Sequence, residues 1–193
     1  MILKEFTGLT KEAYDLLFND FKPAQIFDLE DFDNARKNGY YHIYYFYDET
    51  NILVGYAFCG HAGENDVQLD FIAIFKEQRE KRRGLGSELL RQLNNLLHPK
   101  GILAEVEPEP DGGSPENSRY RFFQKMGFEK QDIVYILPEI DEDNNVIPAH
   151  YTILYRHPEG KKIQLGADVL REMFRDYTEK VLPGAMPTIK DKP

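Results

Sequence analysis

A glycine-bearing turn between a buried strand and an amphipathic helix carries the strongest chemical signal in this chain. It lies in the stretch FIAIFKEQREKRRGLGSELLRQL, residues 71–93. The first turn of a helix leaves backbone N–H groups unpaired and carries the positive end of the helix dipole. Gly84 and Gly86 keep side chains away from those groups, so a diphosphate can reach them. Lys81, Arg82 and Arg83 add positive charge beside the turn. The stretch therefore predicts a site for a phosphate-bearing ligand.

The spacing of the glycines distinguishes this turn from other phosphate-binding motifs. No Gly-Lys-Ser/Thr follows a four-residue gap, as a P-loop requires, and the third glycine of a dinucleotide fingerprint is missing. Residues 81–86, following the apolar strand, resemble instead the acyl-CoA signature R/Q-x-x-G-x-G/A of the GNAT superfamily of N-acetyltransferases. The resemblance implies that the turn holds the pyrophosphate of acetyl-CoA and that the strand backbone binds its pantetheine arm. The cofactor-binding residues implied in this half are Ile72, Ala73, Ile74, Lys81, Arg82, Arg83, Gly84, Leu85, Gly86 and Ser87.

A second element of the same family follows downstream. The segment RFFQKMGFEK, residues 121–130, resembles the superfamily's A-x-x-x-Y-x-x-x-G-F element. It implies cofactor contacts from Asn117, early in the helix, and from Phe123. The first half departs from the family in two ways. Lysine stands at position 81, where arginine or glutamine is usual, and the connection from Ile74 to Gly84 is longer than usual, so we expect the turn to bulge.

Two carboxylates are candidates for the general base. Acetyl transfer to an amine needs a neutral amine, a donor that polarises the carbonyl and a proton for the leaving thiolate. Glu105 in LAEVE resembles the glutamate of the L-E-V strand in acetyltransferases that act on ribosomal-protein N-termini. Asp70 lies on the neighbouring strand, where Gln68 shares its face. The alternative for Glu105 is a solvated carboxylate on an edge strand, and Glu107 is interpreted as exposed.

The proton donor of the superfamily is missing from its usual position in this sequence. The superfamily's tyrosine stands four residues before the glycine of G-F, and here that residue is Phe123, which cannot donate a proton. Tyr120, three residues earlier on a nearby helix face, is the candidate substitute. Other candidates are ordered water and the tyrosines of the late strands, Tyr135, Tyr151 and Tyr155. A thiolate can also leave without a dedicated acid.

The elements that must position these residues alternate between strands and helices. Expected strands are 2–6, 41–47, 52–59, 68–75, 102–106, 133–138 and 150–157, and residues 48–51 supply a hairpin turn. Expected helices are 10–21 capped by Thr10, 86–98, 115–126 ended by Gly127, and 167–181. Residues 22–39 are irregular or partly helical. The order predicts an α+β, three-layer fold with a mixed, mostly antiparallel sheet of about seven strands, in one domain over 1–193 that includes 133–182.

Composition narrows the class of protein further. The formal net charge of −9 argues against nucleic acid as a partner, although residues 76–83 hold five cations and two anions. No run approaches the roughly 18 apolar residues of a membrane helix, and the N-terminus lacks the features of a signal peptide. A single cysteine, Cys59, allows no internal disulfide, and no metal-ligand spacing occurs among the Cys and His residues. We expect a cytoplasmic protein without a metal, and a homodimer is compatible with this composition.

Three functions are compatible with these features. The leading one is an N-acetyltransferase that uses acetyl-CoA as co-substrate and acts on a primary amine of a small molecule or peptide. The second is a GNAT-fold module that binds acyl-CoA as a sensor without catalysis, which Phe123 favours. The third is a nucleotide-binding regulator that uses the same turn. The acidic composition favours a cationic acceptor such as a polyamine, an amino sugar or a lysine-bearing peptide.

Overall fold

The computed structural model describes residues 1–81, 84–107, 118–140, 145–181 and 186–192. Its helices are α1 (Thr10–Leu17), the 3-10 turn η1 (Pro23–Gln25), α2 (Leu29–Lys37), α3 (Lys76–Lys81), α4 (Leu85–Leu97), α5 (Ser118–Lys125) and α6 (Ala167–Lys180). Its strands are β1 (Ile2–Glu5), β2 (Tyr41–Tyr47), β3 (Leu53–Ala62), β4 (Asp66–Ile74), β5 (Ile102–Val106), β6 (Glu129–Lys130), β7 (Ile133–Ile140), β8 (Val146–Arg156) and β9 (Thr188–Asp191). None of the described helices is long and apolar enough to cross a membrane.

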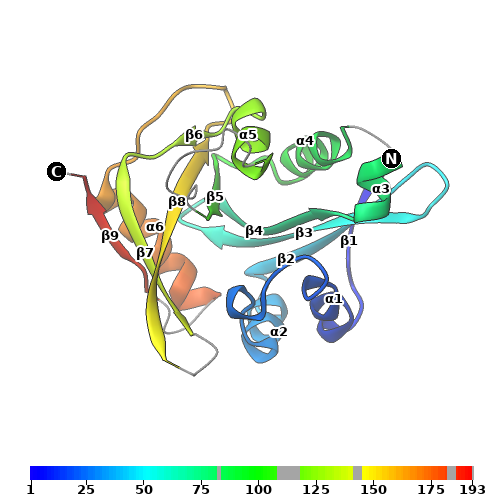
Figure 1. Ribbon diagram of the computed structural model, residues 1–193, viewed down its shortest axis with the longest axis horizontal. Coiled ribbons are helices and arrows are strands. Elements are labelled where there is room, and N and C mark those ends of the chain that lie inside the picture. Colours follow the sequence, from blue (N-terminus) through cyan, green and yellow to red (C-terminus); the bar gives the residue numbers. More distant parts are fainter. Residues whose placement is uncertain (82–83, 108–117, 141–144, 182–185, 193) are drawn as a thin grey trace.

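The strands form one mixed sheet between two layers of helices. The strand order is β1-β2-β3-β4-β5-β8-β7-β9, and β6 pairs with β8. Helices α4 and α5 cover one face, and α1, α2 and α6 cover the other (Figure 1). The apolar stripe predicted for α4 packs on the first face through Leu89, Leu90 and Leu93, all fully buried. The predicted fold class is confirmed, with nine strands in place of about seven.

The two central strands, β4 and β5, pair over only part of their length. β4 pairs with β5 in parallel, the one parallel pair among the described strands, and only Val67–Leu69 and Ile102–Ala104 are in register. On its other side β4 continues to pair with β3 as far as Ile74. Beyond Leu69, β4 and β5 therefore separate, and the β5-facing edge of β4 is left without a partner strand in the described chain.

A bulge in β4 lies where the two strands separate. The register with β3 shifts there, because Phe58 pairs with Phe71 whereas Cys59 pairs with Leu69. Asp70 is the extra residue between them. A bulge bends its strand and re-aims side chains. Asp70 and Phe71 consequently lie on the same face, the one covered by α1, α2 and α6.

Several local predictions are corrected by the structure. Thr10 does not cap α1; it is the first residue of the helix, and its hydroxyl donates to Asp33 at 2.6 Å. The helix ends at Leu17 rather than near Phe21, and residues 22–39 contain η1 and α2. The longer connection between β4 and α4 takes the form of helix α3. Strands β6 and β9 were not predicted, since one has two residues and the other follows the last expected helix.

Candidate active site

The glycine-bearing turn that the sequence predicts to bind phosphate has a left-handed backbone at Gly84. Gly84 precedes α4 with φ +84° and ψ 0°, a left-handed conformation that L-residues avoid. Apart from its chain neighbours, no described atom lies within 4 Å of the position that a Cβ would occupy there. Leu85 is buried and anchors the first turn of the helix in the core, whereas Gly86 and Ser87 are partly exposed.

The start of α4 lies beside the end of the separated strand. A Cβ at position 86 would lie 3.9 Å from the Ile74 side chain and 3.3 Å from the Phe122 ring of α5. Three elements thus meet: the N-terminus of α4, the unpaired edge of β4 along Ile72–Ile74, and α5. Lys81 ends α3 and is exposed. Arg82, Arg83 and Asn117 lie outside the described residues.

The two candidate carboxylates lie together on the other face of the sheet. Glu105 accepts hydrogen bonds from Gln68 Nε2 and from the Tyr135 hydroxyl, each at 2.9 Å and both at Oε1. Its Oε2 has no hydrogen-bond partner among the described residues. Asp70 accepts a bond of 2.7 Å at Oδ2 from the hydroxyl of Tyr177, on α6. We define these five residues as the carboxylate cluster.

The surroundings of the cluster are largely closed. Gln68 is 1% exposed, and its Oε1 has no partner in the described part of the chain. The same is true of the Tyr41 hydroxyl, which is buried beside Asp70. Strand β5 pairs with β8 over Ile102–Val106, so Glu105 is not on an edge strand. Glu107 lies at the strand end and contacts Lys22 and Gln25 near the surface.

The candidate proton donors occupy different places. Tyr120 packs on the core that α4 and α5 cover, on the face opposite the carboxylate cluster. Phe123 is buried at 6% exposure, with its ring against Phe122 and Phe128. Tyr155 donates to Asp66 at 3.2 Å, outside the cluster. The structure therefore places Tyr120 across the β4–β5 gap from Glu105, and Phe123 in the core.

The sequence comparison decides the family. Residues 6–128 match the model of the Acetyltransferase (GNAT) family, well over half of the chain. This chain belongs to the GNAT acetyltransferase family. The matched residues include the glycine-bearing turn at Gly84, Asp70 and Glu105. Tyr135 and Tyr177 lie beyond the match. No curated protein gives a significant match.

Solved GNAT structures share the fold at low sequence identity. A GNAT-family acetyltransferase from Bacteroides thetaiotaomicron is 20% identical, with a TM-score of 0.70 over 95% of this chain and 99% of the other. The ribosomal-protein-S18-alanine N-acetyltransferase of Escherichia coli is 16% identical, with a TM-score of 0.56 over 81% and 92%. A GNAT acetyltransferase from Elizabethkingia anophelis with acetyl-CoA bound is 16% identical, with a TM-score of 0.53 over 81% and 97%. At these identities the likeness shows the fold alone.

The pKa values of Glu105 and Asp70 are both raised toward neutral pH. Burial raises the pKa of Glu105 from its ordinary value of 4.5 to about 8, and the nearby charge of Asp70 acts in the same direction. The hydrogen bonds from Tyr135 and Gln68 oppose that rise. Burial also raises the pKa of Asp70 to about 7, against the hydrogen bond from Tyr177. Each carboxyl can thus take up or release a proton near neutral pH, as a general base must.

The signals for these residues differed in strength. Glu105 and Asp70 were found from the sequence, and Tyr135 was expected only as a proton donor. Tyr177 was assigned to the apolar stripe of the last helix, and no local pattern connects it to Asp70, 107 residues away. Among the described residues, no group of three or more His, Cys, Asp or Glu side chains is placed to hold a metal.

Proposed function

We propose that this GNAT protein is an N-acetyltransferase that moves the acetyl group of acetyl-CoA to a primary amine of a small molecule or peptide by direct attack. One observation carries the proposal. Tyr135 and Gln68 hold Glu105 by one oxygen, and Oε2 has no partner among the described residues, at the point where β4 and β5 separate. In its ionised form, a carboxyl with a pKa of about 8 in that position can accept the proton of an incoming ammonium group.

Features on the α4 side of the sheet fit acetyl-CoA as the co-substrate. The open turn at Gly84 and the first N–H groups of α4 suit a pyrophosphate. The unpaired backbone of Ile72–Ile74 offers hydrogen bonds to the amide groups of a pantetheine arm. The family membership and the acetyl-CoA bound to the Elizabethkingia GNAT protein support this assignment. Lys81, Arg82, Arg83, Ser87 and Asn117 remain proposed contacts, as does Phe123, whose buried ring would act only through packing.

In this proposal the amine is deprotonated on one face of the sheet, and the thiolate is protonated on the other. Glu105 Oε2 takes a proton from the ammonium, and the neutral amine then attacks the thioester carbonyl carbon. A C–N bond forms, the C–S bond breaks and the nitrogen loses its second proton to water as the amide forms, so the thiolate leaves on the face that carries α5. Tyr120 lies on that face and is the proposed donor to the thiolate. Asp70 stays close enough to Glu105 to raise its pKa, which strengthens it as a base.

The acceptor is proposed to be cationic before it reacts. Two carboxyls and the unpartnered Oε1 of Gln68 all favour an ammonium group over a neutral or anionic one. The E. coli neighbour, an alanine N-acetyltransferase of a ribosomal protein, is an example of amine acetylation on this fold. Polyamines, amino sugars and lysine-bearing peptides are the proposed classes. A cytoplasmic location and a homodimer remain predictions.

Turnover of acetyl-CoA with a panel of amines tests the proposal. We expect release of free thiol, detected with a thiol reagent, together with an acetylated amine detected by mass spectrometry. The matched control is Glu105→Gln, which should bind CoA normally and turn over slowly. If CoA binds tightly and no amine in a broad panel is acetylated, the sensor function replaces the enzyme. Displacement of CoA by ATP would instead favour a nucleotide-binding regulator.

A further inference from the structure

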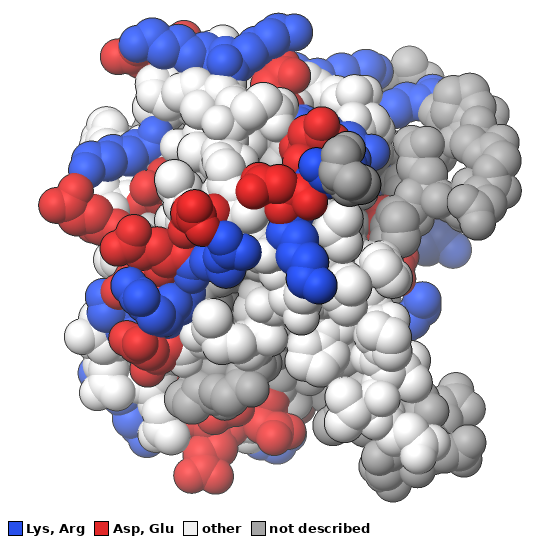
Figure 2. Space-filling view, turned by 90° about the vertical axis from the view of Figure 1, so that its left-hand side faces the viewer, with Lys and Arg blue, Asp and Glu red and all other residues white. Residues whose placement is uncertain are grey.

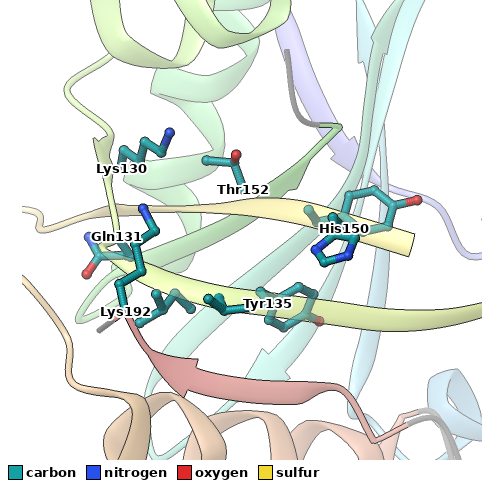
Figure 3. Close-up of a pocket in the computed structure, with 9 residues that line it drawn as sticks. Lys130, Gln131, Tyr135, His150, Thr152 and Lys192 are labelled. Atoms are coloured by element: carbon teal, nitrogen blue, oxygen red, sulfur yellow. The ribbon is translucent and has the colours of Figure 1, made fainter. Parts of the chain in front are cut away.

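A pocket of about 210 Å³ opens where β8 passes from one partner strand to another. β8 pairs with β6 at Leu154 and Tyr155, and with β7 only from Tyr151 toward Val146. Between these two ladders one backbone bond, from Gln131 N to Ile153 O at 2.9 Å, links the strands. The sheet is therefore open at this point, and side chains of β6, β7 and β8 and Lys192, just after β9, line the opening (Figure 3).

The polar lining of this pocket is cationic. In Figure 3 the side chains of Lys130, Lys192 and Thr152 extend toward one opening, and His150 lines the other end. No aspartate or glutamate is among the lining residues. Lys192 pairs with Asp132 at 2.8 Å outside the lining, whereas Lys130 has no ion pair within the described chain.

The positive charge of this lining contrasts with the charge of the rest of the protein. The protein carries a formal net charge of −9. At the end of the molecule that carries β9, acidic and basic side chains are interspersed (Figure 2). Asp132 already offsets part of the charge of Lys192, whereas the ammonium group of Lys130 has no carboxylate partner in the described chain, so an anion in the pocket would offset its charge.

The floor of the pocket is rigid. Gln131 is 1% exposed and uses its whole amide group within the protein. Its Nε2 donates to the carbonyls of Glu129 and Ile163 at 3.0 and 3.1 Å, and its Oε1 accepts from the Leu165 N–H at 2.7 Å. These bonds hold the strand end from which Lys130 projects, so little ordering of that segment is needed when a ligand binds.

We propose that this pocket is a binding site for the carboxylate or phosphate group of a small molecule. The ammonium groups of Lys130 and Lys192 and the hydroxyl of Thr152 supply charge and hydrogen bonds to the anion's oxygens. The volume equals that of about seven liquid water molecules, enough for a phosphate and a few further atoms.

One side chain separates this site from Glu105. The ring of Tyr135 lines the pocket, and its hydroxyl donates to Glu105. The anion can therefore come from two sources: a free metabolite, or the far end of the amine that is acetylated. The second source rests on the proposed function, and the first does not.

Titration with inorganic phosphate tests the site itself. It is done at low salt on protein saturated with CoA, so that the turn at Gly84 is already filled. We expect saturable binding by calorimetry, about tenfold weaker in the Lys130→Gln/Lys192→Gln double variant and weaker in both proteins at high salt. The matched control is Lys161→Gln, an exposed lysine paired with Glu159 away from the pocket. The proposal is overturned if CoA-saturated protein binds no phosphate, or if the control loses as much affinity as the double variant.

Steady-state kinetics then distinguish the two sources. 4-Aminobutyrate and butylamine have the same chain length and differ in a terminal carboxylate. If the pocket holds the acceptor's far end, the double variant raises KM about tenfold for 4-aminobutyrate and leaves butylamine unchanged. If phosphate binding weakens while both KM values stay constant, the site takes a free anion. Failure to acetylate any amine would count against the proposed function and leave the phosphate titration interpretable.

Discussion

Replacing Glu105 by glutamine should remove activity and stabilise the fold at alkaline pH. Both protein donors bind Glu105 at Oε1, so a glutamine carbonyl can keep both bonds while its amide replaces the open Oε2. The variant therefore changes charge and basicity with little change in packing. We expect turnover at neutral pH to fall by about two orders of magnitude, a typical loss for a general base.

The effect on stability follows from the raised pKa. Glu105 has a pKa of about 8 in the folded chain and an ordinary value of 4.5. Between these values the folded state binds more protons than the unfolded state, so the free energy of unfolding falls as the pH rises. The full difference corresponds to at most about 5 kcal/mol. Because solvent reaches part of the side chain, we expect about 2 kcal/mol.

Denaturant unfolding of both proteins at pH 5 and pH 8.5 measures this effect. The wild type should lose about 2 kcal/mol more than Glu105→Gln between the two pH values. Glu107→Gln, two residues along the same strand face, is the matched control and should behave like the wild type. In kinetics, the rise of kcat/KM with pH toward about 8 should be absent in Glu105→Gln. Equal pH dependence of unfolding in all three proteins would refute the buried, protonated state of Glu105.

Four further substitutions test other parts of the site. Gly86→Val places a side chain against an aromatic ring of α5 and should weaken CoA binding at least about tenfold in a folded protein, measured by calorimetry. Tyr120→Phe should slow single-turnover acetyl transfer without changing acetyl-CoA affinity. Phe123→Tyr should lower the free energy of unfolding by about 1–3 kcal/mol, measured with denaturant, because it buries an unpaired hydroxyl. Tyr177→Phe removes a hydrogen bond that favours the ionised form of Asp70, so the pKa of Asp70 should rise further from about 7, measured by carboxyl carbon NMR.

Local patterns in the sequence were sufficient for the turn and its helix. The leucines of α4 form an apolar stripe that depends on neighbouring residues and packs in the core of the structure, where the helix follows a left-handed Gly84. Gly127 is also left-handed, with φ +83° after α5. Glu105 was identified by its strand context, but its burial required the pairing of β5 with β8, residues some fifty positions later in the chain.

The rest of the site depends on contacts that no local pattern records. The bulge that turns Asp70 toward α6 carries no glycine, and the partner strand appears continuous in the sequence. Tyr177 fits the apolar periodicity of its helix, so its hydroxyl contact could not be separated from simple core packing. Phe123 was expected beside the ligand because of its place in a motif. In the structure its ring packs against two aromatic neighbours in the core, and its contact with the ligand stays a prediction.

The contact between α6 and Asp70 has a consequence for how the protein folds as it is synthesised. Strands β1 to β5 and the phosphate-binding turn leave the ribosome first, and up to that point Asp70 and Glu105 are open to water. Open carboxyls are ionised in the cell, whereas the closed site favours their protonated forms. Docking of β7 and α6 therefore draws protons from the solvent. Asp70 and Glu105 thus reach the environment that raises their pKa values only when the last helix packs over them.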